Sequence, residues 1–300
     1  MNDYNDNKTA ILALIFGIAV LGFSAIFIQM ADAPGIVSVF YRMFIGSVVV
    51  SIPFFINRKK HTYSRKGVAW AILAGLFFGV DLSFFATGIV IGGATIPTLM
   101  SNTAPLWVGL GSFLFFKEKS TKWFWVGIVL AFVGMVSVVG LQTSLVSSTI
   151  GRGAVLGLIS GLFYSGFYLV AQKGRGLIDT LSFFWISTTS SAALLLVVSL
   201  IKGYSLTGYS TKTIWVFVGL GLVIQVFGWV LVNYAQGHVP AYIVSPTLLG
   251  QPVLTAVWAR LLFNEQLSFT QIVGGILVLS GILVIHGSRN SHTLRRKMLL

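Results

Sequence analysis

The feature that most constrains this chain is a series of long apolar runs, which recur from one end to the other with only short polar gaps. A helix needs about 20 apolar residues to cross the hydrocarbon core of a bilayer. The sequence therefore predicts an all-α integral membrane protein with ten transmembrane helices. The predicted segments are Thr9–Met30, Gly35–Ile56, Gly67–Gly88, Ala94–Phe116, Lys122–Leu141, Gly153–Gln172, Thr180–Ile201, Thr213–Gln236, Pro240–Phe263 and Leu267–Gly287.

Composition agrees with lipid as the main solvent of this chain. Of its 300 residues, 56% are apolar and only 9% are charged, whereas soluble domains carry about 25% charged residues. The first segment could be a secretory signal. Its apolar run is too long for one and lacks a small-residue cleavage site, so a mature helix is predicted.

Positive charge is distributed unevenly between the two sets of alternating gaps. Fifteen Lys and Arg residues, from Lys8 to the basic tail at 288–300, lie in the set that includes both termini. By the positive-inside rule, both termini are cytoplasmic, in the inner cell membrane, and the tail lies on the anionic inner leaflet. A net charge of +13 could suggest nucleic acid, but charges confined to short loops argue against that partner.

An internal repeat appears when the chain is shifted by 147 residues. The pattern Pro–Glu–Gly–Gly then occurs twice with the same spacing, once in each half. The matched pairs are Pro105 with Pro252, Glu118 with Glu265, Gly127 with Gly274, and Gly134 with Gly281. We therefore predict two five-helix repeats, 9–141 and 153–287. Because five is odd, the second repeat inserts upside down, as in many secondary transporters.

The doubled pattern, together with Phe40–Tyr41–Arg42 in the second segment, resembles the EamA-type family of the drug/metabolite transporter superfamily. The resemblance covers nearly all of residues 9–287. It implies a ten-helix, exporter-like fold with a central cavity between the halves, lined by helices one, three, four, six, eight and nine. It also implies substrates such as amino acids, other metabolites, drugs or nucleotide sugars.

Prolines interrupt the fourth and ninth segments at corresponding places. An interior proline removes a backbone hydrogen bond, and the freed carbonyl must face protein or a wet cavity. These prolines are either packing kinks or the walls of a binding site, and their pairing across the repeat favours the site. They are Pro97, Pro105, Pro246 and Pro252.

Two charges lie well inside predicted helices. Asp81 and Arg42 each lie about 10 Å below the outer end of an antiparallel helix, counted at about 1.5 Å per residue. Intramembrane ions usually pair or line a pathway. We predict an Arg42–Asp81 ion pair that locks two helices, with a substrate or proton site at Asp81 as the functional alternative.

Polar and aromatic residues are concentrated on the helices expected to line the cavity. Uncharged polar side chains deep in a bundle either bond other helices or face solute. Many of the rings could instead face lipid or form interfacial belts. The candidate substrate-binding residues are Asp81, Asn102, Trp107, Tyr164, Tyr168, Gln225, Trp229, Asn233, Tyr234, Tyr242 and Gln251.

Two repeated glutamates receive a structural interpretation. Glu118 and Glu265 follow helix ends on opposite faces of the membrane, so they cannot form one carboxylate pair. Thr121 and Ser268, three residues later, are predicted N-caps. Stripes of small residues predict close helix packing. These stripes are Gly153, Gly157 and Gly161 on the sixth segment, and Gly75 and Gly79 on the third.

These observations predict a secondary active or facilitative transporter that exports a small organic metabolite, such as an amino acid, by alternating access. The predicted partners are the bilayer and a small-molecule substrate. Proton coupling through Asp81 and simple exchange are both open, as is the oligomeric state. The sequence has no cysteine, no metal-ligand spacing and no phosphate-binding loop, so no cofactor and no enzyme activity are expected. The alternatives are a membrane-embedded enzyme, a channel or a non-transporting subunit.

Overall fold

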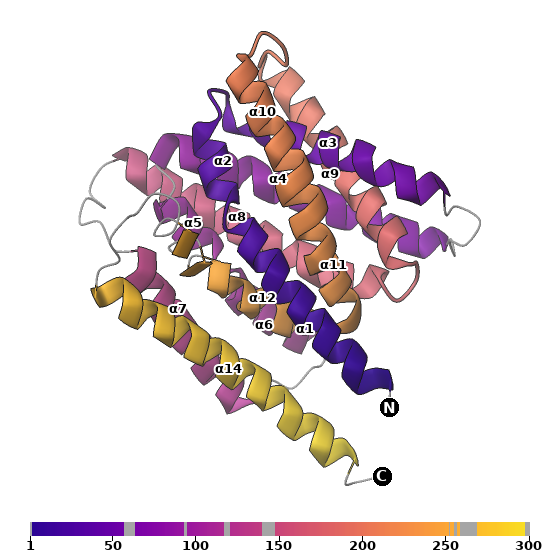
Figure 1. The fold of residues 1–300 in the computed structure, drawn as a ribbon, viewed down its shortest axis with the longest axis vertical. Coiled ribbons are helices and arrows are strands. Elements are labelled where there is room, and N and C mark those ends of the chain that lie inside the picture. The colour runs from indigo at the N-terminus through magenta and orange to yellow at the C-terminus, as the bar shows by residue number, and fades with distance from the viewer. Residues whose placement is uncertain are drawn as a thin grey trace.

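The structure is a computed structural model that describes residues 2–56, 64–92, 95–116, 121–139, 148–251, 253–254, 257–258 and 269–297. All regular elements within these residues are helices, which pack into one bundle (Figure 1). The first half of the chain forms α1 (Asn2–Leu21), α2 (Ser24–Met30), α3 (Gly35–Ile56), α4 (Arg65–Gly92), α5 (Thr95–Ser101), α6 (Ala104–Phe116) and α7 (Lys122–Val139). The second half forms α8 (Ser148–Gly174), α9 (Thr180–Ile201), α10 (Thr211–Gly219), η2 (Leu220–Gly228), α11 (Trp229–His238), α12 (Ala241–Thr247), η3 (Leu248–Gly250) and α14 (Phe269–Lys297).

In the described part of the chain, six helical stretches are long and apolar enough to cross a membrane. They are Lys8–Ile28, Gly35–Ile56, Arg65–Gly92, Gly151–Gly174, Thr180–Ile201 and Thr211–His238. Four shorter apolar helices, Ala104–Phe116, Lys122–Ser137, Ala241–Gly250 and Ile272–Gly287, occupy the other predicted segments. The protein is therefore a multi-pass membrane protein.

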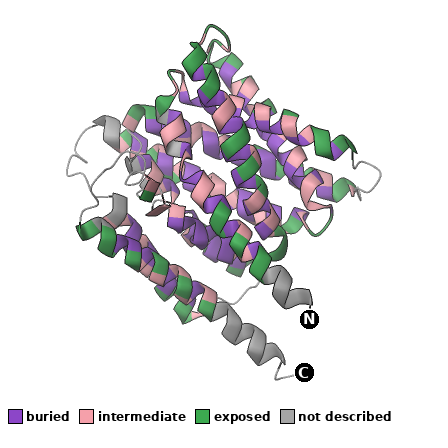
Figure 2. Ribbon diagram, in the orientation of Figure 1, coloured by how far each residue is buried: buried purple, intermediate pink, exposed green. Residues whose placement is uncertain are grey.

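The outer surface of the bundle carries large apolar side chains, as the exposed positions in Figure 2 indicate. Phe115 is 71% exposed, Ile201 78% and Leu283 71%. A soluble monomer rarely exposes continuous apolar surface of this kind. Lipid chains would cover it instead.

Side-chain caps explain why several helices begin where they do. Asp179 accepts a hydrogen bond from the Ser182 backbone N–H (3.0 Å) at the start of α9. The Phe124 N–H donates to Thr121 Oγ1 (3.2 Å), which confirms the predicted cap of α7. Each cap satisfies a backbone donor that the first helical turn leaves without a partner. Glu118, Glu265 and Ser268 lie outside the described residues.

Two predicted segments differ from the regular helices expected. The first is divided between α1 and α2, where Phe23 N–H bonds the Val20 carbonyl (3.1 Å) rather than the carbonyl four residues back. The eighth contains η2, a π-helix of nine residues between α10 and α11. π-Segments are rare and often occur at functional sites.

The predicted small-residue stripes do bring helices into close contact. At Gly157 an added Cβ would lie 2.5 Å from the Pro97 carbonyl oxygen, so α8 packs directly on the backbone of α5. At Gly75 an added Cβ would lie 2.3 Å from the Ser187 carbonyl oxygen, which joins α4 to α9 in the same way. No side chain larger than hydrogen fits at either crossing.

The repeated glycines meet where α7 crosses α14. A Cβ on Gly134 would lie 2.5 Å from the Gly274 carbonyl oxygen, and a Cβ on Gly281 would lie 2.5 Å from the Gly127 carbonyl oxygen. The two helices lie side by side along one edge of the bundle (Figure 1). All four glycines of the repeated pattern are therefore used in one helix–helix contact.

Candidate functional site

The fourth and ninth segments are broken near their prolines. Pro105 has no N–H to bond the Ser101 carbonyl, and α5 ends at Ser101 before α6 begins at Ala104. Pro246 lies inside α12, which passes after Thr247 into the 3-10 turn η3. Pro97 is buried in α5 against α4 and α8, while Pro252 lies outside the described residues.

Asp81 lies near the middle of α4 and is only 4% exposed. Its Oδ1 accepts a hydrogen bond from Ser160 Oγ on α8 (2.5 Å). Ser160 Oγ is in turn 2.9 Å from Ser101 Oγ, at the end of α5. A chain of hydrogen bonds therefore connects this carboxylate to the break in the fourth segment.

Arg42 on α3 is also 4% exposed and reaches a different helix. Its Nε donates to Gln225 Oε1 (3.0 Å), and Gln225 Nε2 donates to Thr188 Oγ1 on α9 (3.4 Å). Gln225 lies in η2, so the π-segment presents its amide to the guanidinium. The Arg42 guanidinium carbon lies 6.0 Å from the centre of the Phe78 ring.

The predicted ion pair is not formed: within the described residues, Arg42 and Asp81 share no salt bridge. Arg42 is bonded to Gln225 on η2 and Asp81 to Ser160 on α8. The two charges are still close enough to interact electrostatically with each other and with Tyr164. The predicted proximity of the two residues is therefore found, but they are not paired with each other.

Aromatic rings surround these charges. Tyr168 OH donates to Tyr164 OH (2.8 Å), and the Tyr164 ring lies 6.2 Å from the Trp229 ring. The Phe78 and Trp229 ring centres are 4.7 Å apart. The predicted residues gathered here, together with two that the sequence did not single out, form what we call the central cluster: Arg42, Phe78, Asp81, Ser160, Tyr164, Tyr168, Gln225 and Trp229.

Phe78 and Ser160 were not among the predicted site residues. Phe78 precedes Asp81 by three residues, and Ser160 precedes Tyr164 by four. Each is therefore on the same helix face as its predicted neighbour. That spacing was the signal available in the sequence.

Other predicted residues of the first half contact their own helices. Asn102 Nδ2 donates to the Thr98 carbonyl (2.8 Å) at the break. Trp107 is 40% exposed, and its Nε1 donates to Thr103 Oγ1 (3.3 Å). These contacts stabilise the end of α5 and the start of α6.

Two predicted residues of the second half lie beside other rings. Tyr234 lies beside the His238 ring, with ring centres 4.5 Å apart. Tyr242 lies 6.0 Å from the Phe124 ring. Both are only partly buried.

Gln251 belongs to a contact between the ninth segment and the break in the first. Gln251 Nε2 donates to the Leu21 carbonyl (2.9 Å), and Trp258 Nε1 donates to the Ala19 carbonyl (2.9 Å). The Trp258 ring stacks on Phe23, with centres 4.9 Å apart. Side chains of one broken helix therefore cap carbonyls at the break of another.

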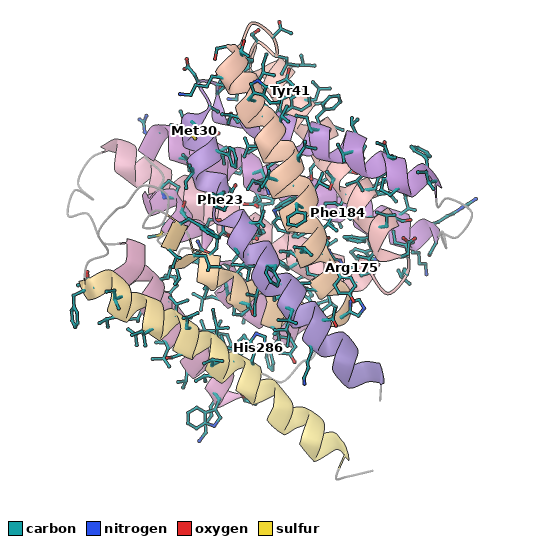
Figure 3. All side chains as sticks on the ribbon, viewed as in Figure 1. Phe23, Met30, Tyr41, Arg175, Phe184 and His286 are labelled. Carbon is teal, nitrogen blue, oxygen red and sulfur yellow. The ribbon has the colours of Figure 1, made fainter. Side chains whose placement is uncertain are left out.

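Asn233 accepts hydrogen bonds from Arg175, which lies in a loop near the N-terminal end of α4. Arg175 Nη1 donates to the Asn233 carbonyl (2.8 Å) and Nη2 to its side-chain oxygen. Arg175 is labelled in Figure 3. Its guanidinium carbon lies over the Phe183 ring, 4.9 Å from the ring centre. Burial lowers the pKa of Arg175 to about 9, so the group is still charged at neutral pH.

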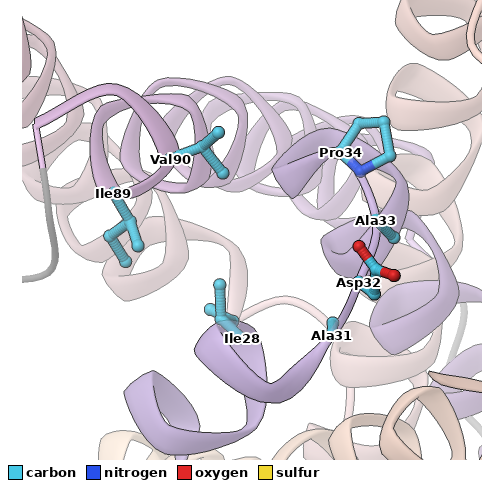
Figure 4. A pocket seen from close by; sticks show the side chains of 7 residues that line it. All are labelled: Ile28, Ala31, Asp32, Ala33, Pro34, Ile89 and Val90. Carbon is cyan, nitrogen blue, oxygen red and sulfur yellow. The ribbon is translucent and has the colours of Figure 1, made fainter. Parts of the chain in front are cut away.

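A hollow of about 530 Å³ opens at the other end of α4 (Figure 4). Its lining comes from α2, the turn to α3 and the last part of α4: Ile28, Ala31, Asp32, Ala33, Pro34, Ile89 and Val90. The loop that carries Arg175 packs instead on Gly67, in the first turn of α4. The hollow and the Arg175–Asn233 contact therefore lie toward opposite ends of α4, and Asp81 lies between those ends.

Comparisons with known proteins agree with this architecture. The sequence profile of the EamA-like transporter family matches residues 8–140 and, a second time, residues 151–287. An uncharacterized transporter, YoaV, of Bacillus subtilis (strain 168) is 22% identical over 253 residues, which are 84% of this chain and 87% of the relative. An S-adenosylmethionine uptake transporter of Rickettsia felis is 22% identical over 82% of this chain and 81% of its own.

A solved crystal structure superposes on the chain with a TM-score of 0.74 at 14% identity, covering 92% of this chain and 96% of the other. That likeness establishes a shared fold. Because the family profile accounts for both halves of the sequence, the chain belongs to the EamA-like transporter family.

Proposed function

We propose that this protein is a secondary transporter that exports a small organic metabolite by alternating access between two inverted five-helix repeats. The observation that carries the proposal is the central cluster, in which two charged side chains, Arg42 and Asp81, are buried among aromatic rings inside the bundle. Ionisable groups are costly inside a membrane. Their position beside broken helices supports a role in solute binding.

The α7–α14 crossing supports the inverted arrangement of ten crossing segments. A shift of 147 residues maps the Gly134–Gly274 contact onto the Gly281–Gly127 contact, with equal added-Cβ distances of 2.5 Å. A two-fold axis in the membrane plane would generate both contacts at once. The same axis would exchange the third segment with the eighth and the sixth with the first. It would therefore map the contact of α4 with α8 onto the contact of α11 with α1, and both contacts are present.

Charge distribution supports an orientation with both termini in the cytoplasm. In Figure 1 the start of α1 and the end of α14 lie at the same corner of the bundle. This orientation puts the hollow on the outer side and Arg175 on the cytoplasmic side. The chain would then be in an outward-open state, from which an exported solute leaves.

One relative with a named substrate supports a solute with both polar and aromatic groups. S-adenosylmethionine, named for the Rickettsia relative, joins an amino acid group to an aromatic base. The central cluster offers charges and rings side by side. A metabolite such as an amino acid is therefore the substrate class we propose to test first.

The decisive experiment is flux into proteoliposomes against a panel of labelled metabolites, with and without an imposed pH gradient. We expect saturable flux of at least one solute. A panel of amino acids, nucleosides and sugars without any saturable flux would remove the proposal.

Replacing Asp81 by asparagine tests proton coupling at the same time. Asparagine keeps the shape and can still accept from Ser160, but it carries no charge. We expect flux to fall about tenfold, as for the loss of one charge-assisted interaction of about 1.4 kcal/mol. We also expect the remaining flux to lose its response to the pH gradient. Full transport with an unchanged pH dependence would exclude Asp81 as a proton site.

A further inference from the structure

The central cluster contains charged atoms that lack partners. Within the described residues, the two terminal nitrogens of Arg42 donate no hydrogen bond, because the one hydrogen bond of this side chain uses Nε. Asp81 likewise bonds only through Oδ1. Neither set of atoms is among the buried polar atoms that are sealed without a partner. These atoms therefore border a space that water-sized groups can enter.

The two unpaired ends have opposite charge and belong to α3 and α4, which are in contact. Phe78 and Asp81 are three residues apart on one face of α4, and the guanidinium lies 6.0 Å from the Phe78 ring centre. The two charges interact electrostatically without a salt bridge. A cationic fork and a carboxylate oxygen, which are not paired with each other, are therefore both available to a ligand.

A carboxylate suits the unpaired end of Arg42. The guanidinium presents parallel N–H donors that match the two oxygens of a carboxylate. Gln225 fixes the guanidinium through Nε, which leaves the terminal nitrogens for a ligand. Asp81 Oδ2 is an acceptor that suits an ammonium group.

The remaining walls are aromatic. Trp229 is 3% exposed, and its indole N–H has no hydrogen-bond partner within the described residues. Its ring lies 4.7 Å from Phe78 and 6.2 Å from Tyr164. Such walls suit an apolar or aromatic side group.

We propose that Arg42 and Asp81 bind the carboxylate and the ammonium group of one zwitterionic solute, an α-amino acid or a larger molecule that contains one. The inference rests on the proposed transport function and specifies its substrate class. The ligand replaces the missing ion pair: it neutralises both charges and joins α3 to α4.

The test compares three probes of similar size by calorimetric titration of the purified full-length protein. L-Phenylalanine carries both charges, 3-phenylpropionate only the carboxylate, and phenethylamine only the ammonium group. We expect the wild type to bind phenylalanine at least about tenfold more tightly than either analogue, because each lacks one charged hydrogen-bonding group.

Each of two variants should abolish the preference for phenylalanine over a different one of the two analogues. With Asp81→Asn, phenylalanine and phenylpropionate should bind within about twofold of each other. With Arg42→Gln, phenylalanine and phenethylamine should become equivalent. Arg65→Gln removes an exposed charge from the same helix as Asp81 and should leave all three affinities unchanged. A loss of folding cannot produce this crossed pattern, because each variant is judged by ratios between its own ligands.

Equal binding of all three probes by the wild type would overturn the inference, as would a parallel loss of all three in both variants. Saturable flux of a neutral sugar, with no binding of any zwitterion, would also overturn it while leaving the transport function intact. Absence of saturable flux for every solute would instead remove the transport function itself.

Discussion

Replacing Gly281 with leucine is expected to reduce flux to that of empty liposomes. A Cβ at this position would lie 2.5 Å from the Gly127 carbonyl oxygen and 2.6 Å from the Ala131 backbone nitrogen. Backbone atoms cannot rotate away as a side chain can, so α7 and α14 must separate. Forced overpacking costs about 3 kcal/mol, and here it would also break the contact between the ends of the two proposed repeats.

Gly287→Leu is the matched control, because it lies on the same helix and an added Cβ there meets nothing within 4 Å. Thermal stability in detergent and flux in liposomes should both be close to wild type for this control. If the two-fold relation holds, Gly134→Leu should reproduce the loss seen with Gly281→Leu. A Gly281→Leu protein with normal flux and stability would show that the crossing is not needed for the fold.

Replacing Arg175 with glutamine is expected to open the end of the bundle at which Arg175 bonds Asn233. The variant loses two hydrogen bonds to Asn233 and the contact with Phe183. Hydrogen bonds to charged groups contribute about 2 kcal/mol, so the open population should rise roughly thirtyfold. The sequence has no cysteine, so a single Ala171→Cys reporter, buried at 1% exposure one turn before Arg175, reports the opening without interference.

Labelling by a membrane-impermeant maleimide, applied to the face that we propose to be cytoplasmic, measures that population. The Lys66→Gln control removes an exposed charge at the same end of α4 and should not change the labelling rate. Arg175→Lys keeps the charge without the paired donors and should be intermediate. An unchanged rate in Arg175→Gln would show that other contacts keep this end closed.

Uninterrupted helices could be predicted from the sequence alone. The bounds of α3 and α9, Gly35–Ile56 and Thr180–Ile201, coincide with the predicted segments, because each apolar run is bounded by turn or cap residues such as Pro34 and Asp179. The break between α1 and α2 contains no proline. It is stabilised by Gln251 and Trp258, which are more than 200 residues away, so no local pattern reveals it.

The sequence could predict how deep the charged residues of the candidate site lie in the membrane, but not which neighbours their side chains face. Counting residues from a helix end fixes how deep Arg42 and Asp81 lie, while the side each faces depends on helix rotation and packing. Gln225 lies in the π-segment η2, where the sequence predicted a regular helix. Arg42 therefore bonds Gln225, where depth alone suggested Asp81.

The capped break in the first segment has a consequence for how the molecule can move. A carbonyl without a partner is expensive in lipid, so α1 should travel with the ninth segment, whose Gln251 and Trp258 cap it. A hydrogen bond between the Ser101 and Ser160 hydroxyls links the fourth segment to the sixth. The helices that should move together therefore come from both halves of the chain: the first with the ninth, and the fourth with the sixth. We expect that neither half moves as a rigid body by itself.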